Sequence, residues 1–140
     1  MIRVQTEDFD IGAEVKALTS GRTDIGALVT FTGLVRDSNG GTVASMELEH
    51  YPGMTEKELS RIEAEANERW PLQASLIIHR VGKLSPGDNI VLVVTASAHR
   101  QAAFDAASFL MDYLKTRAPF WKREETGDKS HWVDARESDG

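Results

Sequence analysis

Apolar residues recur along this chain with two different periods, and these periods predict its secondary structure. Alternating or continuous apolar runs predict strands, whereas apolar residues spaced three or four positions apart predict amphipathic helices. The predicted strands cover residues 2–5, 26–35, 43–51, 74–82, 89–97, 120–125 and 131–136. The predicted helices cover residues 11–20, 55–70 and 98–115. This order of elements indicates an α+β fold in which helices pack on a largely antiparallel sheet.

The second and third predicted helices have recognisable start signals. Thr55 and Glu58 have the spacing of a capping box, and Ser97 is the predicted N-cap of the third helix. The apolar stripe of the second helix consists of Leu59, Ile62, Ala66 and Trp70. The stripe of the third helix consists of Phe104, Ala107, Met111 and Leu114, widened by Phe109, Leu110 and Tyr113. A stripe of this width predicts a helix that is mostly buried.

The composition is that of one ordinary globular domain, which we predict to span residues 1–140. Hydrophobic residues make up 41% of the chain, which is enough to bury a core at this length. The chain has no cysteine, and this excludes disulfides, thiolate metal sites and thiol nucleophiles. His50, His79 and His131 are scattered without the spacing of metal ligands, so we expect no metal and no other cofactor. His50 is expected to face the core.

The charge balance limits the possible partners. The chain has 22 acidic and 16 basic residues and a formal net charge of −6, so a general nucleic-acid-binding surface is not expected. The amino-terminal residues lack a basic segment followed by a long apolar run, and no segment approaches the length of a membrane span. We therefore expect a cytoplasmic protein that does not bind membranes.

One stretch of the acidic chain is basic, and it is the first candidate site. Lys115, Arg117, Lys122 and Arg123 lie within nine residues that contain no acidic side chain. Mutual repulsion among these cations would suit a lysine to act as an acid, a base or an amine nucleophile. A solvated basic helix end explains the composition equally simply and is the more common case. Aromatic residues inside the stretch favour a site that excludes water around an anion or a flat ring.

The start of the third predicted helix is the second candidate site. His99 and Arg100 place two potential cations in its first turn, where the helix dipole disfavours positive charge. A bound phosphate or carboxylate would compensate, because free backbone N–H groups also point outward there. Pairing with carboxylates of the chain is an equally good explanation. Arg36, after a predicted strand, and Arg136, near the end of the last one, are weaker candidates for ligand contacts.

The two candidate sites are far apart on one helix. His99 and Lys115 are separated by 115 − 99 = 16 positions, which corresponds to roughly 24 Å along a straight helix. One small substrate cannot contact both ends. Either a second copy of the chain brings its helix start to the first copy's helix end, as in a symmetric dimer, or the two ends are separate anion sites.

Five segments closely resemble the family of large, catalytic subunits of molybdopterin synthase. They are VTFTGLVRD (29–37), LEHYPGMTEKEL (48–59), TASAHRQAAF (95–104), MDYLKTRAPFWKRE (111–124) and WVDARES (132–138). The resemblance runs from about residue 26 to residue 138, and its motifs occur in the family's order. It implies an α/β hammerhead-like fold with an additional antiparallel β-subdomain.

The resemblance also implies a function. The family converts cyclic pyranopterin monophosphate to molybdopterin, in molybdenum cofactor biosynthesis, by installing two dithiolene sulfurs. The sulfur comes from a small ubiquitin-like sulfur carrier subunit, whose C-terminal Gly-Gly ends in a thiocarboxylate. The large subunits form a homodimer, and a carrier at each end completes a heterotetramer. The chain's lack of cysteine agrees with sulfur arriving on a partner.

The resemblance assigns roles to individual residues. Lys115 and Lys122 correspond to the family's two catalytic lysines near the carrier's C-terminus. Residues that correspond to contacts with the pterin, its phosphate or the pocket wall are Arg36, His99, Arg100, Phe31 and Arg136. A non-catalytic subunit that only binds an anion or a carrier tail remains the alternative. A phosphoester hydrolase is a third interpretation, but the chain shows neither a metal cluster nor an evident nucleophile.

Overall fold

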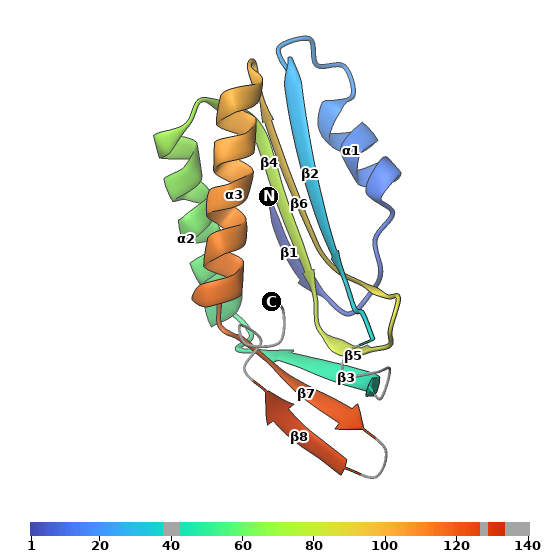
Figure 1. Cartoon of the computed structure of the whole chain (residues 1–140). Coiled ribbons are helices and arrows are strands. Elements are labelled where there is room, and N and C mark those ends of the chain that lie inside the picture. The colour runs from blue at the N-terminus through green and yellow to red at the C-terminus, as the bar shows by residue number, and fades with distance from the viewer. Residues whose placement is uncertain (38–42, 127–128, 134–140) are drawn as a thin grey trace.

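The computed structural model describes residues 1–37, 43–126 and 129–133, and Figure 1 shows their arrangement. The elements in chain order are β1 (Ile2–Gln5), α1 (Ile11–Thr19), β2 (Ala27–Leu34), β3 (Val43–His50), α2 (Met54–Arg69), β4 (Leu72–Arg80), β5 (Gly82–Leu84), β6 (Asn89–Ser97), α3 (Arg100–Thr116), β7 (Phe120–Thr126) and β8 (Lys129–Val133). None of the helices in the described ranges is long and apolar enough to span a membrane.

The first sheet forms the middle layer of the molecule. Its strands are ordered β1-β4-β6-β2, with β1 parallel to β4 and the other pairs antiparallel. Helices α2 and α3 cover one face, and α1 covers the other (Figure 1). Ile77 and Val93 are buried toward α2 and α3, whereas Ile78 and Val94 are buried toward α1. Burial on both faces explains why the central strands are nearly continuous apolar runs.

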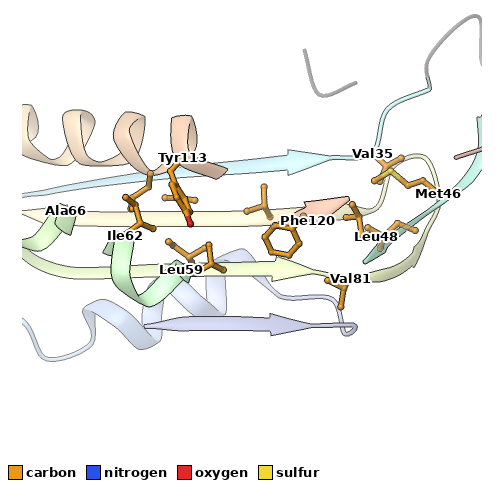
Figure 2. Packing of buried hydrophobic residues seen from close by; sticks show 14 residues of the cluster. Val35, Met46, Leu48, Leu59, Ile62, Ala66, Val81, Tyr113 and Phe120 are labelled. Atoms are coloured by element: carbon orange, nitrogen blue, oxygen red, sulfur yellow. The ribbon is translucent and has the colours of Figure 1, made fainter. Parts of the chain in front are cut away.

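The second sheet lies across one end of the first. Its strands are antiparallel in the order β5-β3-β7-β8. Met46 and Leu48 of β3 are buried, while Glu47 and Glu49 between them are partly exposed, so one face of this sheet is covered. In Figure 2 Phe120 lies between the part of the core under the helices and the part under the second sheet. The core is therefore continuous across both sheets.

The predicted α+β class and the additional antiparallel subdomain are confirmed. The hairpin predicted from residues 74–82 and 89–97 is also present, because β4 pairs with β6. The strand β5 was not predicted. It consists of three residues that leave the first sheet after Val81 and pair with β3 of the second. An element this short has too few positions to show a period.

The predicted start of α2 is wrong in detail. Its N-cap is Gly53, whose backbone N–H donates to the Glu56 carboxylate at 2.9 Å. The Thr55 side chain is buried, accepts a hydrogen bond from the Tyr51 N–H and donates one to the Pro119 carbonyl. Glu58 pairs with Arg61 instead of closing a capping box. Thr55 thus joins the start of α2 to the segment before β7.

The predicted cap and stripe of α3 also need correction. The N-cap is His99, and Ser97 is the last residue of β6, where its hydroxyl donates to the Pro71 carbonyl. Phe104 is 58% exposed. The buried residues of α3 are Ala103, Ala106, Ala107, Leu110 and Tyr113. The alanines let the helix lie close to the sheet, and both stripes have helical spacing, so the period alone could not choose between them.

Candidate active site

The two candidate sites lie at opposite ends of α3, as their spacing predicts. His99 precedes the first residue of the helix, and Lys115 lies in its last turn. Strand β2 shows to which end Arg36 belongs. It is antiparallel to β6, with Ala27 opposite Ser97 and Leu34 opposite Asn89. Arg36 follows the Leu34 end, so it lies at the end of the sheet near Lys115 and away from His99.

Lys122 is the most deeply buried of the predicted site residues. It is the third residue of β7, opposite Leu48 of β3 and Val133 of β8, and is only 4% exposed. A buried ammonium group loses its hydration, which is costly unless the surroundings compensate. A buried lysine on a strand that also places Phe120 in the core is therefore an exception to ordinary core packing. Such exceptions are typical of functional sites.

A short connection brings Lys115 and Lys122 to the same end of the molecule. Three residues separate α3 from β7, and backbone hydrogen bonds fix them: Arg117 N–H and Ala118 N–H both donate to the Tyr113 carbonyl, and Phe120 N–H donates to the Ala118 carbonyl. The Thr55 hydroxyl holds the Pro119 carbonyl from the side of α2. The chain thus turns directly from the helix that carries one lysine into the strand that carries the other.

The aromatic residues of the basic stretch separate onto two faces. Phe120 points inward with Lys122, and its ring stacks on His79 with centroids 3.8 Å apart and planes 13° apart. The His50 ring lies farther from Phe120, with centroids 6.4 Å apart and planes 29° apart. Trp121 lies on the opposite face and contacts Tyr51 at 4.7 Å. Of the two aromatic residues in the basic stretch, Phe120 therefore shares a face with Lys122 and Trp121 does not.

The four cations of the basic stretch do not act as one group. The guanidinium of Arg117 lies over the Tyr113 ring, 5.2 Å from its centroid. The Tyr113 hydroxyl donates to the Glu58 carboxylate at 3.3 Å. Burial, followed by the nearby Glu58 charge, raises the pKa of the Tyr113 phenol. The side chain of Arg123 lies outside the described residues. Lys115 and Lys122 are therefore the two cations of this stretch that we consider further as candidate catalytic residues.

Backbone contacts hold Arg36 and Phe31 near the end of β2. The Val35 N–H donates to the Asp88 carbonyl at 2.8 Å, and the Gly87 N–H donates to the Val35 carbonyl at 2.6 Å, so Arg36 follows a residue that is fixed on both sides. Phe31 lies opposite Val93 on the α3 side of the sheet and is 39% exposed. The exposed Arg36 thus lies at the sheet end near Lys115, whereas Phe31 lies level with the middle of β6.

His99 and Arg100 differ from the lysines because both are exposed. The His99 side chain makes no capping hydrogen bond. In residues 1–37, 43–126 and 129–133 neither side chain forms an ion pair with a carboxylate. Two potential cations at a helix start suit an anion site, because the helix N-terminus also offers free backbone N–H groups. Arg136 lies outside the described residues.

His79 lies beside the predicted site but was not predicted to belong to it. This residue is 8% exposed near the end of β4, where it takes the inward position that alternation from Ile77 assigns to it. Its Nδ1 lies 2.9 Å from the Arg80 carbonyl oxygen, and because a carbonyl only accepts, Nδ1 carries the proton. The alternation was visible in the sequence, but its stacking partner Phe120 is 41 positions away.

Comparisons with known proteins agree on one family. The family model described as MoaE protein matches residues 4–117. A molybdopterin synthase catalytic subunit from Mesorhizobium japonicum is 63% identical over 140 residues, which cover 99% of this chain and 87% of that protein. The solved molybdopterin biosynthesis MoaE protein from Burkholderia ambifaria has a TM-score of 0.85 and 57% identity, covering 99% of this chain and 91% of that one.

A more distant structure has the same fold. It is the complex of subunits 1 and 2 of molybdopterin-converting factor from Helicobacter pylori, with a TM-score of 0.81 and 18% identity. The match covers 96% of this chain and 91% of that one. The family match begins at residue 4, so residues 4–25, which carried none of the resembling motifs, also belong to the shared region.

Proposed function

This chain belongs to the MoaE family of molybdopterin synthase catalytic subunits, and from that membership we propose the reaction of its site and the residues that perform it. It is therefore an enzyme subunit of molybdenum cofactor biosynthesis, not a subunit that only binds. The proposed reaction converts cyclic pyranopterin monophosphate to molybdopterin by adding two sulfur atoms.

The sulfur is proposed to arrive on a small ubiquitin-like carrier. The chain has no cysteine on which to hold sulfur, so another molecule must deliver it. The Helicobacter pylori relative of the same fold was solved as a complex of two subunits, which supports a second subunit here. The carrier's C-terminal Gly-Gly thiocarboxylate is slender and anionic, and it would enter the lysine end of α3.

The proposed chemistry has two covalent steps for each sulfur. The thiocarboxylate sulfur attacks a pyran-derived carbon of the pterin that carries an oxygen substituent. A carbon–sulfur bond forms as the carbon–oxygen bond breaks, the departing oxygen keeps the electron pair and takes up a proton, and the carrier is then joined to the pterin as a thioester. Water then cleaves the thioester, so the carrier leaves as a carboxylate and the sulfur stays on the pterin. A second carrier repeats both steps. Lys115 and Lys122 stabilise the negative charge that develops and supply protons.

Phe31 and Arg36 are proposed to hold the pterin beside the lysines. Arg36 is exposed at the end of a fixed strand, where a guanidinium can form a bidentate pair with a phosphate. The partly exposed ring of Phe31 offers a surface on which a flat heterocycle can stack. Arg136 is proposed as a further contact.

His99 and Arg100 are proposed to act in the site of a second copy. The helix separates them from Lys115 of their own chain by roughly 24 Å, so only a symmetric dimer brings both ends to one substrate. Strand β2 is an edge of its sheet, and Phe31, Leu34 and Phe104 are exposed at 39%, 53% and 58% on it and on α3. Such a surface is suited to a partner. With one carrier on each protomer, the assembly is a heterotetramer.

The observation that carries this proposal is the buried Lys122 just after the helix end that carries Lys115. The test is a reaction of the purified protein with cyclic pyranopterin monophosphate and thiocarboxylated carrier, followed by mass spectrometry of the pterin. We expect a gain of two sulfurs with the unchanged chain. Lys115→Ala should lower the rate by about 100-fold or more, because it removes a group that stabilises the transition state.

Lys57→Ala is the matched control, since Lys57 is an exposed lysine on α2. It should leave the rate unchanged. An unchanged rate of sulfur gain in Lys115→Ala would remove Lys115 from the mechanism. No sulfur gain by the unchanged chain, with a carrier shown to be bound and thiocarboxylated, would contradict the proposed reaction.

A further inference from the structure

We propose that His79 is a positioning residue for the reaction, because its ring holds Phe120 and thereby sets the place of Lys122. The inference rests on the proposed function of Lys122. His79 does not belong to the predicted site and has no assigned role. It is nevertheless a buried titratable side chain in direct contact with the strand that carries the buried lysine.

The contact joins the two sheets. His79 lies on β4, a central strand of the first sheet with neighbours on both sides, whereas Phe120 begins β7 of the second. Their rings are nearly parallel, with centroids 3.8 Å apart. The second sheet lies across the end of the first (Figure 1), and Phe120 lies in the continuous core of the two sheets (Figure 2). Through this stack the rigid central sheet contacts the start of the strand that carries the lysine.

The plane of the His79 ring is fixed independently of Phe120. Its Nδ1–H donates to the Arg80 carbonyl at 2.9 Å. The Arg80 guanidinium in turn donates to the Thr6 carbonyl at 3.0 and 3.2 Å and to the Asn89 carbonyl at 3.1 Å. The backbone around His79 is thus tied to the residues after β1 and to the start of β6. A ring held in this way constrains the ring that stacks on it.

A shift of Phe120 would be transmitted to Lys122. The two residues are two positions apart on one strand, so their side chains point to the same face, and both are buried. Opposite them on β3 are His50 and Leu48, respectively. A displacement of about 1 Å in a catalytic group can cost as much as 100-fold in rate. Loss of the His79 ring would therefore slow the chemical step without removing any group that touches the substrate.

A matched pair of variants separates the ring from the hydrogen bond. His79→Phe keeps a stacking ring and loses the donor, whereas His79→Asn keeps a donor near the position of Nδ1 and loses the ring. In the complete system of chain, carrier and cyclic pyranopterin monophosphate, we expect His79→Phe to retain kcat within about threefold and His79→Asn to lose roughly 10- to 100-fold in kcat. KM for the carrier should stay the same in both. His79→Leu, which lacks the ring but stays apolar, provides a second ringless variant should His79→Asn fail to fold.

A second measurement distinguishes positioning from general destabilisation. In a Lys122→Met background, the ringless variants should lose no more than about twofold further, since residues that act as one unit are not additive. Three results would each overturn the inference. The first is an equal loss of kcat in His79→Phe and in the ringless variants, and the second is a rise in KM for the carrier in place of a fall in kcat. The third is full additivity of the rate losses with Lys122→Met. Failure of the proposed function would differ from these outcomes, because the unchanged chain would then add no sulfur to the pterin.

Discussion

The two ends of α3 carry similar side chains in opposite environments. At its C-terminal end, Lys115 lies in the last turn and the following strand places Lys122 at 4% exposure beside a stacked aromatic ring. At its N-terminal end, His99 and Arg100 are exposed and make no ion pair in the described part of the chain. Lys122 is buried and Lys115 is partly buried by the chain, whereas His99 and Arg100 are exposed to solvent.

The helix dipole affects the positively charged side chains at the two ends of α3 in opposite ways. Cations at a helix C-terminus are stabilised by the helix dipole, and cations at an N-terminus are destabilised by it, typically by about 0.3–1 kcal/mol. The lysine end is therefore favourable in the free protein. Under the proposed function, an anion bound at the His99 end would offset this unfavourable dipole interaction, and a second copy of the chain would supply the rest of the site.

The largest expected effect is at the buried end. Lys122→Met keeps a long, buried side chain but removes the charge, and we expect kcat for sulfur transfer to fall by about 100- to 1,000-fold. Lys83→Met is the matched control, because Lys83 is an exposed lysine in β5 of the same sheet. Both variants should show the same circular dichroism spectrum as the unchanged chain. A loss in Lys83→Met as large as in Lys122→Met would show that the assay responds to charge in general.

Mixing two inactive variants tests whether the two ends meet across a dimer. His99→Ala and Lys115→Ala should each be impaired when alone. When they are mixed and allowed to exchange subunits, half of the dimers are mixed, and each contains one intact site and one doubly altered site. We therefore expect recovery of about one quarter of the unchanged activity. Absence of recovery, with subunit exchange demonstrated by native mass spectrometry, would mean that the two ends serve separate sites.

The same mixing experiment assigns Arg36 to one end. The register of β2 places Arg36 at the lysine end, so Arg36→Ala and Lys115→Ala alter the same site and should not complement each other. Arg36→Ala mixed with His99→Ala should recover activity, again to about one quarter. The opposite pattern would show that Arg36 acts with the His99 end of its own chain.

The smallest expected effect concerns stability at high pH near the lysine end. Burial raises the pKa of Tyr113, which means that the fold favours the neutral phenol. Its contribution to stability is complete below the unfolded-state pKa of about 10 and is lost as the pH rises through the higher folded-state pKa. The free energy of unfolding, measured with urea, should therefore fall less between pH 7 and pH 11 for Tyr113→Phe than for the unchanged chain.

Tyr51→Phe is the control for this comparison, because Tyr51 is the other tyrosine of the chain and is 54% exposed. Its pH dependence should match that of the unchanged chain. If Tyr113→Phe showed the same loss at high pH as the unchanged chain, the ionisation of Tyr113 would not limit alkaline stability.

Much of the fold could be predicted because its signals are local. The stripe of Leu59, Ile62 and Ala66 has helical spacing, and these residues are buried as predicted. The alternation in residues 43–51 correctly placed Met46 and Leu48 in the core. Both signals repeat over several turns or positions of one element. The predictions failed at caps and at β5, where only one or two residues decide the outcome.

The candidate site was predictable in composition but not in geometry. Basic and aromatic residues at 115–123 indicated an anion site, yet the sequence did not show that Trp121 lies on the face opposite Phe120 and Lys122. It also did not identify His79, which belongs to another sheet. Contacts between residues far apart in sequence depend on how the elements pack, and a local period carries no information about that packing.

By itself the sequence determined the order and type of the main elements, the separation of His99 from Lys115 along one helix, and the absence of any cysteine thiol that could hold sulfur on this chain. Only the tertiary structure decided that the alanine stripe of α3, and not Phe104, faces the sheet. It also decided that Arg36 lies at the same end of the sheet as the lysines, that Lys122 is buried, and that His79 stacks on Phe120. The physical reason is that a period fixes which residues share a face, whereas strand register and the packing of one element on another decide what that face meets.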